Sequence, residues 1–160
     1  MEDIWNITAL VVSVLSVLLS LYALRQATTK NTSDMYLFFI SQYAKEDMKL
    51  ALRKLKDIKR GVYRLEQWES DMKNNLPKAF EYDEARRLVK YFYDTLAYMK
   101  LEKLIEARFV RLICLKKGAW LYLDTVEAME KFFDSGYDKK PYAVIRDVCE
   151  NLRKEGYCPP

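Results

Sequence analysis

The strongest constraint on the fold is one uninterrupted apolar stretch, Ile4–Leu24, which contains no charged residue. As a helix it would be about 31 Å long at about 1.5 Å of rise per residue, enough to cross a hydrocarbon core about 30 Å thick. A buried helix of a soluble protein rarely stays apolar on every face over such a length. The stretch therefore predicts a transmembrane helix.

Charges at the two ends of this stretch predict its orientation. Glu2 and Asp3 precede it and Arg25 follows it, which reverses the order found in a secretory signal peptide. The residues around Leu24 also make a poor cleavage site, so we expect an uncleaved anchor. Basic residues near a span stay in the cytoplasm, and Lys30 and several later ones reinforce the excess on this side. We expect the N-terminus outside the cell membrane and the following domain in the cytoplasm.

Small residues recur on one face of the apolar stretch, at alternating steps of three and four. In lipid, helices associate through close backbone approach, to which Ser hydroxyls and an Asn amide can add hydrogen bonds. We expect this face to pack against a second copy of the chain in a homodimer or against a transmembrane partner subunit, although Ser and Ala are also tolerated in plain spans. The same spacing continues over residues 37–58, either as an extended pairing or as the core face of a bundle. The packing seam consists of Asn6, Ala9, Ser13, Ser16, Ser20, Ala23 and Ala27.

Residues 31–160 are expected to form one soluble helical domain, which residues 1–30, an anchor and a short hinge, join to the membrane. Apolar residues spaced by three and four predict its helices, and no period-two run bounded by turn residues predicts a strand. The expected fold class is all-α, with the N-terminal transmembrane helix followed by a cytoplasmic bundle of five or six helices. The run Met35–Ile40 is apolar all round and is expected in the core, with a place on the membrane interface as the alternative. The predicted helices cover residues 34–60, 65–75, 84–100, 101–115, 119–134 and 141–155.

Further residues are expected inside this bundle. The helix over 84–100, which Asp83 would cap, carries a stripe of apolar residues on one face. Trp68 and Trp120 are better explained as core anchors than as ligand platforms. The chain has three cysteines and no C-x-x-C pair, so we expect no disulfide framework, and Cys114 and Cys149 are expected as small core residues. The apolar stripe consists of Ala85, Leu88, Phe92, Leu96 and Met99.

The residues available for chemistry are few. The chain contains no histidine, the commonest general base and transition-metal ligand. It also lacks the dinucleotide, P-loop, nucleophile-elbow and EF-hand motifs. We therefore expect no catalytic residue, no cofactor and no metal site. The enzymatic alternative is a metal-assisted hydrolase that uses Glu81, Asp83 and Glu84, but acids at a helix start are explained more simply as caps.

One face of the helix over 84–100 is a candidate partner face. Its members fall at three- and four-residue steps, apart from the apolar stripe. Arg and Tyr on one face are typical of protein-binding hot spots, although an ordinary amphipathic face has the same composition. The candidate partner face consists of Glu84, Arg87, Tyr91, Asp94 and Tyr98.

A nucleic-acid interface is an alternative use of the same helix. Arg86, Arg87, Lys90 and Tyr91 could bind phosphates and stack on bases. The net charge of +4 is modest and both signs are interspersed, which favours a solvated surface over a nucleic-acid footprint. A weak attraction to anionic membrane lipids is compatible with the same charge.

Four segments of the domain, together with the apolar stretch, resemble a family of prokaryotic single-pass membrane proteins that carry a domain of unknown function. They are Ala51–Leu55, Trp68, Asp83–Arg87 and Gly118–Leu121. The resemblance implies a membrane anchor and a helical fold, and it implies no activity, cofactor or catalytic residue. We expect a membrane-tethered, non-catalytic interaction or sensing module that recruits a partner at the cytoplasmic face, or else an accessory subunit of a larger membrane complex.

Overall fold

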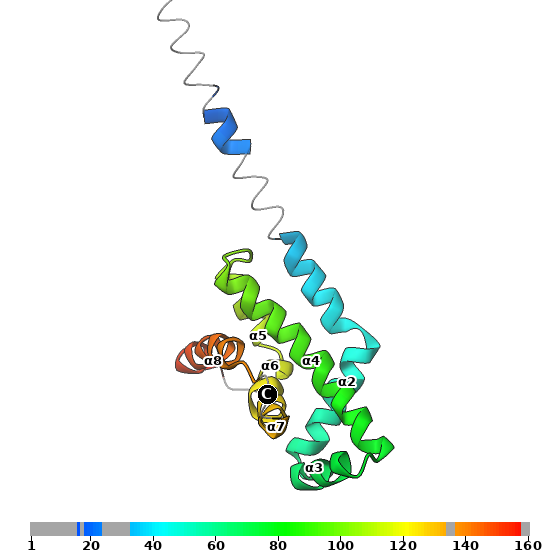
Figure 1. Ribbon diagram of the computed structural model, residues 1–160. Coiled ribbons are helices and arrows are strands. Elements are labelled where there is room, and N and C mark those ends of the chain that lie inside the picture. The colour runs from blue at the N-terminus through cyan, green and yellow to red at the C-terminus, as the bar shows by residue number, and fades with distance from the viewer. Residues whose placement is uncertain (1–15, 17, 24–32, 134–136, 158–160) are drawn as a thin grey trace, which may run out of the picture. The chain divides into compact units, whose positions relative to one another are not determined.

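The computed structural model describes residue 16 and residues 18–23, 33–133 and 137–157 of the chain (Figure 1). The chain divides into two compact units, Met1–Leu37 and Phe38–Pro160. Every regular element in the described ranges is a helix, which confirms the all-α class and the helical bundle.

In the first unit, residues 18–23 are helical and exposed. The Ser20 hydroxyl donates a hydrogen bond to the backbone oxygen of Ser16 at 2.8 Å. Most of the predicted span Ile4–Leu24 lies outside the described residues. Among the residues that are described, no helix combines the length and the hydropathy needed to cross a membrane.

The second unit is built around the long helix α4. A helix over residues 33–44 leads into this unit, and from Phe38 on it runs beside α4 (Figure 1). Helix α2 packs along α4 as well, and α8 contacts it from another side. The elements are α2 (Glu46–Lys59), α3 (Leu65–Lys73), α4 (Pro77–Leu101), α5 (Ala107–Cys114), α6 (Lys117–Leu121), the π-helix η1 (Tyr122–Val126), α7 (Glu127–Phe133) and α8 (Lys139–Lys154).

Helix α4 begins seven residues before its predicted start at Glu84, because Pro77 occupies its first turn. Proline has no N–H to lose at that position and its fixed φ suits a helix, so Leu76-Pro77 opens this helix as well as closing the preceding segment. The prediction that Asp83 caps a helix is therefore wrong, since Asp83 lies inside α4 and is buried.

The apolar stripe of α4 was predicted only in part. Ala85, Phe92 and Leu96 are buried, but Leu88 is 38% exposed and Met99 is half-buried. Because α4 packs against α2 on one side and α8 on another, it buries a wider arc than one stripe. The arc adds Tyr82, Val89, Tyr93 and Ala97 to the core.

The predicted single helix over 34–60 is interrupted at Lys45, whose ψ of 148° is extended. Glu46 and Asp47 then form an acidic first turn of α2, where negative charge suits the helix dipole. Because of this break, the spaced positions before Lys45 do not lie on the same face as the spaced positions after it. The predicted seam positions Met48, Ala51, Leu55 and Ile58 are buried in the bundle, whereas Leu37, Ser41 and Ala44 are exposed. For α2, this spacing marks the core face.

Two other predicted helices are divided. The helix expected over 101–115 stops at Leu101 and restarts at Ala107, with Lys103 at a positive φ of 57° between them. The helix expected over 119–134 contains the π-helical turn η1. Gly118, which falls between these two predicted helices, lies within α6, where its N–H donates to Tyr43 Oη at 3.2 Å.

Aromatic packing dominates the core of the second unit. Trp68 and Trp120 are buried as predicted, and Cys114 and Cys149 are buried free thiols. In α8, Ile145, Val148, Cys149 and Leu152 are buried, and the helix begins at Lys139, two residues before its predicted start at residue 141. Asp138 caps this helix by accepting a hydrogen bond from the Lys140 N–H at 2.9 Å.

Candidate interaction surfaces

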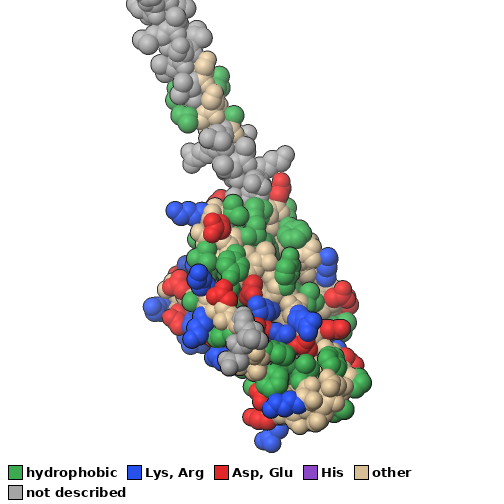
Figure 2. Space-filling view, in the orientation of Figure 1, with side chains coloured by type: hydrophobic (Ala, Val, Ile, Leu, Met, Phe, Trp, Pro, Cys, Tyr) green, Lys and Arg blue, Asp and Glu red, His purple; other side chains and the backbone are tan. Residues whose placement is uncertain are grey.

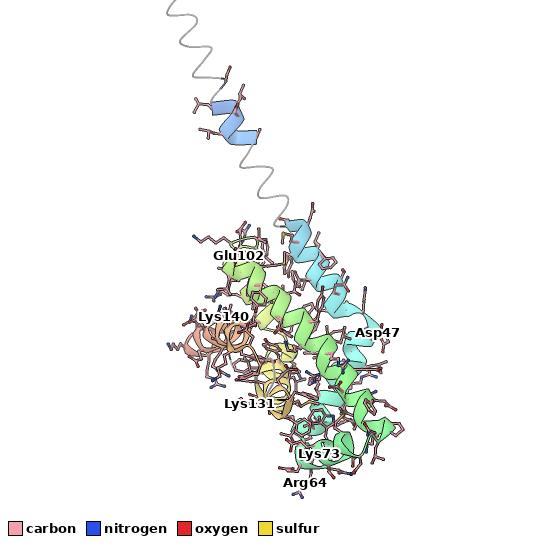
Figure 3. The ribbon with its side chains drawn as sticks, in the orientation of Figure 1. Asp47, Arg64, Lys73, Glu102, Lys131 and Lys140 are labelled. Carbon is pink, nitrogen blue, oxygen red and sulfur yellow. The ribbon has the colours of Figure 1, made fainter. Side chains whose placement is uncertain are left out.

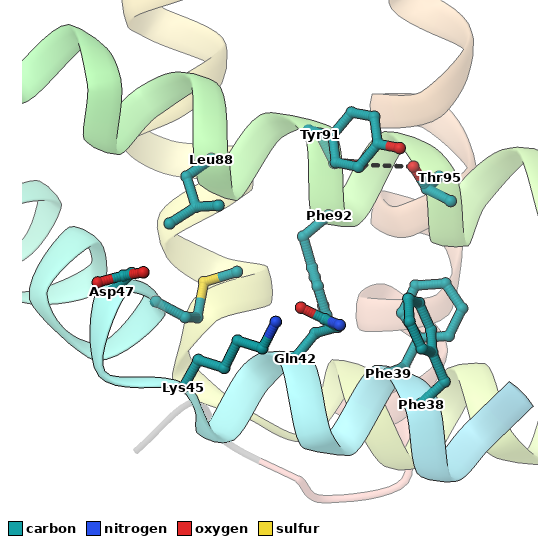
Figure 4. A pocket seen from close by; sticks show the side chains of 10 residues that line it. Phe38, Phe39, Gln42, Lys45, Asp47, Leu88, Tyr91, Phe92 and Thr95 are labelled. Carbon is teal, nitrogen blue, oxygen red and sulfur yellow. Dashed lines mark hydrogen bonds between the residues drawn. The ribbon is translucent and has the colours of Figure 1, made fainter.

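An apolar groove lies between the helix over 33–44, the start of α2 and α4, with a volume of about 390 Å³ (Figure 4). Aromatic and aliphatic side chains from residues 38–48 and from α4 line it, together with a few polar side chains. This combination is typical of ligand and partner sites. The apolar groove is lined by Phe38, Phe39, Gln42, Lys45, Asp47, Met48, Leu88, Tyr91, Phe92 and Thr95.

Ring contacts hold the floor of the apolar groove. The Phe39 and Phe92 ring centroids are 5.3 Å apart in an edge-to-face arrangement, and Tyr43 and Phe92 are 5.9 Å apart. Phe39 and Phe92 are buried, whereas Phe38 is 56% exposed and Tyr91 is 74% exposed. The groove therefore has a fixed floor and two projecting aromatic side chains.

The run Met35–Ile40, which supplies part of this wall, was expected in the core. Only Phe39 within it is buried, whereas Leu37 and Phe38 are exposed. Phe39 and Tyr43 pack on Phe92 of α4, whereas Phe38 turns away from this contact and is exposed. An all-round apolar run at a helix start could have indicated an exposed site, because a single contact face cannot cover it.

The five residues of the candidate partner face have different surroundings in the structure. Glu84, Arg87 and Tyr91 are exposed on α4, and of these only Tyr91 lines the apolar groove. The Arg87 guanidinium contacts Asp83 Oδ2 at 2.7 Å. Across the visible side of the bundle, hydrophobic side chains lie among charged side chains of both signs (Figure 2).

Asp94 and Tyr98, the other two members, are each hydrogen-bonded to another helix or its cap, with Asp94 half-buried and Tyr98 42% exposed. The Tyr122 hydroxyl donates to Asp94 Oδ1 at 2.5 Å, and Lys90 Nζ contacts Asp94 Oδ2 at 2.5 Å. Burial and this carboxylate raise the pKa of Tyr122 well above its usual range. Tyr98 donates to Asp138, which raises the pKa of Tyr98 and lowers that of Asp138. The candidate partner face stays a prediction, and in the structure two of its five residues are hydrogen-bonded to other parts of the bundle.

Comparisons with protein-family models, with curated proteins and with solved structures found no match for this chain. The resemblance to single-pass membrane proteins with a domain of unknown function stays a prediction.

A buried network of ion pairs joins α4 to α7. The Arg86 guanidinium forms ion pairs with Asp83 and with Glu130 of α7, and all three side chains are buried. It also lies 4.7 Å from the centroid of the Phe133 ring. Arg86 is thus enclosed by protein and is not placed to bind phosphates, as the nucleic-acid alternative requires.

Two of the three acids of the enzymatic alternative are also paired with cations. Asp83 is held by Arg86 and Arg87, and Glu81 Oε2 contacts Lys54 Nζ at 2.9 Å. Glu84 is exposed. In the part of the chain that the structure describes, no group of three or more metal-ligating side chains is assembled.

Of the predicted packing seam, Ser16, Ser20 and Ala23 fall among the described residues, and all three are exposed on a helix. The Ser20 hydroxyl is used within its own helix, because it donates to the Ser16 carbonyl. The other seam positions, Asn6, Ala9, Ser13 and Ala27, lie outside the described residues.

Proposed function

We propose that this protein is a membrane-tethered, non-catalytic interaction module whose helical bundle recruits a protein partner at the cytoplasmic face. The observation that carries the proposal is the apolar groove, with Phe38 and Tyr91 projecting beside it. Exposed aromatic side chains around a preformed hollow are typical of interaction sites, and Tyr is enriched among the residues that dominate binding energy.

The occupant that we propose is an amphipathic helix of the partner. The apolar groove runs between two helices and offers an apolar floor to the apolar residues of a third, spaced by three and four. Lys45 and Asp47 both line the groove at separate points, so they can meet either charge on the polar flank of such a helix (Figure 4). A membrane-bound partner would present this helix to a module that is itself anchored.

The tether and the absence of catalysis rest on the sequence. Ile4–Leu24 has the length and hydropathy of a transmembrane helix, and the charges around it favour a cytoplasmic domain. The lack of histidine and of phosphate or acyl-transfer motifs leaves little from which to build an active site.

The test is photo-crosslinking in native membranes. A benzophenone amino acid replaces Tyr91 in the full chain, and the same probe replaces Tyr157, a tyrosine that is 52% exposed and lies outside the apolar groove. We expect a discrete adduct from position 91 alone, which maps by mass spectrometry to an amphipathic segment of one protein. Adducts of the same size from both positions, or none from position 91, would contradict the proposal.

A second pair of variants tests the groove itself. Leu88→Asp places a charge in the groove wall, so the adduct from position 91 should fall at least tenfold. Val62→Asp, at a site that is 72% exposed and outside the groove lining, should leave the adduct unchanged. An adduct that maps to a transmembrane protein of fixed stoichiometry would favour the accessory-subunit alternative.

A further inference from the structure

A second hollow, of about 440 Å³, lies between α2 and the connection from α5 to α6. Its floor is aliphatic and contains Leu52, Leu115 and Leu121. No carboxylate belongs to its lining. Five cations surround it, which defines a basic groove: Lys49, Arg53, Lys56, Lys116 and Lys117.

The charges of α2 are sorted between two sides. On the side that meets α4, Lys54 pairs with Glu81 at 2.9 Å, and the charge of Asp57 acts on Tyr82 of α4. On the side of the basic groove, Lys49 has a single contact, with Glu46 at 3.3 Å, in which both side chains are more than half exposed. Such a surface pair contributes little.

The remaining four cations of the basic groove have no ion pair within the described ranges of the chain. Lys116 and Lys117 are adjacent in sequence, and the fold brings them to the cations of α2 from more than fifty residues away. The five charges of this one hollow exceed the net +4 of the whole chain. Like charges at such density repel one another, so a bound anion that neutralises them lowers the electrostatic energy of the site.

We infer that the basic groove binds the phosphate-bearing headgroups of anionic membrane lipids and holds the bundle against the membrane surface. The inference rests on the proposed membrane tether, but it uses a surface separate from the apolar groove. Clusters of four to eight basic residues on the cytoplasmic side of a span are typical of anionic-lipid binding. Lysine, four of the five cations here, binds phosphate as a point charge from any direction.

The floor of the basic groove favours lipid over nucleic acid. Single-stranded nucleic acid needs aromatic faces on which bases stack. The only aromatic residue in the lining is Tyr43, whose ring packs on Phe92 and whose hydroxyl accepts a hydrogen bond from the Gly118 N–H. An aliphatic floor instead suits the glycerol and upper acyl region of a lipid whose phosphate meets the cations.

The test measures lysine reactivity in the full chain. The protein is reconstituted in nanodiscs of neutral phosphatidylcholine or of phosphatidylcholine with 30% phosphatidylglycerol, and acylation of each lysine is followed by mass spectrometry. We expect at least fivefold slower acylation of Lys56, Lys116 and Lys117 in the anionic discs. Lys73, the last residue of α3 (Figure 3), and Lys103, which follows α4, are exposed and lie outside the groove lining. They serve as internal controls and should not change.

Two additions to the neutral discs identify the source of the anion. If glycerol phosphate at millimolar concentration protects the groove lysines and anionic discs do not, the ligand is a soluble phosphate and the lipid inference is overturned. Protection by a single-stranded RNA alone would overturn it in favour of nucleic acid. Equal reactivity of all lysines in every condition would also overturn it.

A matched triple variant checks the residues. Arg53→Gln, Lys116→Gln and Lys117→Gln together should abolish the protection of Lys56, whereas Lys73→Gln, Lys103→Gln and Lys139→Gln remove the same charge outside the groove and should preserve it. Failure of the tether is seen separately, as a chain that does not co-elute with neutral discs. In that case co-elution with anionic discs, lost only in the groove variant, still supports the basic groove, and its absence overturns it.

Discussion

Gly118 shows how closely the helices approach one another at single residues. A Cβ at this position would lie 2.7 Å from Tyr93 Oη and 3.0 Å from Tyr43 Cε2. Both distances are shorter than ordinary contacts, so α6 can lie this close to α4 only without a side chain. The glycine serves packing, because its φ lies outside the left-handed region that Gly61 and Gly156 adopt.

Gly118→Ala should therefore destabilise the protein by about 1–3 kcal/mol in urea unfolding. The sign is informative, because the same change in an uncrowded helix stabilises by up to about 1 kcal/mol. Tyr93→Phe in the same chain removes the nearest atom and should recover part of the loss. An alanine variant as stable as the wild type would show that the helices can separate at no cost.

Asp94 anchors a polar contact that the sequence assigned to the surface. Asp94→Ala leaves the buried Tyr122 hydroxyl without its acceptor and should cost about 1–3 kcal/mol of unfolding free energy, while Tyr122→Phe should cost about 1 kcal/mol. The double variant should cost less than the sum of the two. Asp147→Ala is the control, since Asp147 is 67% exposed and its contact with Lys100 is 3.7 Å long, and it should change stability by less than about 0.5 kcal/mol.

Residue types alone predicted part of the core. Trp68, Trp120, Cys114 and Cys149 are buried because large or apolar side chains gain from burial wherever the chain allows it. The burial of Arg86 and Asp83 could not be predicted, since Glu130, the second carboxylate that pairs with Arg86, lies more than forty residues away in sequence. A buried charge is tolerated only when an opposite charge pairs with it, and the sequence does not show which residues pair.

Among the elements, η1 is a helical turn that holds one extra residue. A π-helical turn inside an α-helix arises from a single insertion, and the flanking α-helices keep their facing. Deletion of Asp124, an exposed residue of η1, should therefore yield a folded protein with a continuous helix from α6 to α7. Circular dichroism would measure the helix content and urea unfolding the free energy of unfolding. We expect the deletion to lower this free energy by less than the control deletion does.

The control deletes Asp147, an exposed aspartate that also contacts a lysine but lies in regular α-helix. Here the residues that follow rotate by about 100°, which turns Val148, Cys149 and Leu152 away from the core. The free energy of unfolding should fall by several kcal/mol in this control. Similar losses in both deletions would show that η1 has a packing role of its own.

Helices were easier to predict than the places where they join. The periodicity of α2, α4 and α8 extends over several turns and identifies each of them. The breaks at Lys45 and Lys103 carry neither glycine nor proline, so tertiary packing decides them. Pro77 was ambiguous because proline both follows helices and opens them.

At the scale of the whole molecule, the packing seam predicts self-association. Ser13→Leu, Ser16→Leu and Ser20→Leu together should weaken association in a membrane two-hybrid assay at least fivefold, because bulky side chains hold the backbones apart. Since Ser20 already bonds within its helix, we attribute the effect mainly to size. Val11→Leu, Val14→Leu and Val17→Leu add bulk off the seam and should leave association intact. Equal association of the wild type and both triple variants would show that the packing seam does not mediate self-association.

The two grooves were not predicted as sites, for a common reason. The apolar groove joins Phe38 to Tyr91, and the basic groove joins Arg53 to Lys117, so neither is local in sequence. Tyr91 was identified as a candidate because Arg and Tyr shared a helix face. Its real neighbours come from another helix, and periodicity along one helix cannot identify them.

The tyrosines at the centre of the bundle have an optical consequence. The rings of Tyr122 and Tyr142 are stacked 4.4 Å apart at an interplanar angle of 9°, and Tyr93 continues the stack at 5.1 Å from Tyr122. These rings belong to η1, α8 and α4. Aromatic electronic transitions at such distances couple, so the near-ultraviolet circular dichroism should depend on the assembly of these three helices, while the far-ultraviolet spectrum reports their helicity. The protein thus carries its own chromophore for separating tertiary assembly from helix formation.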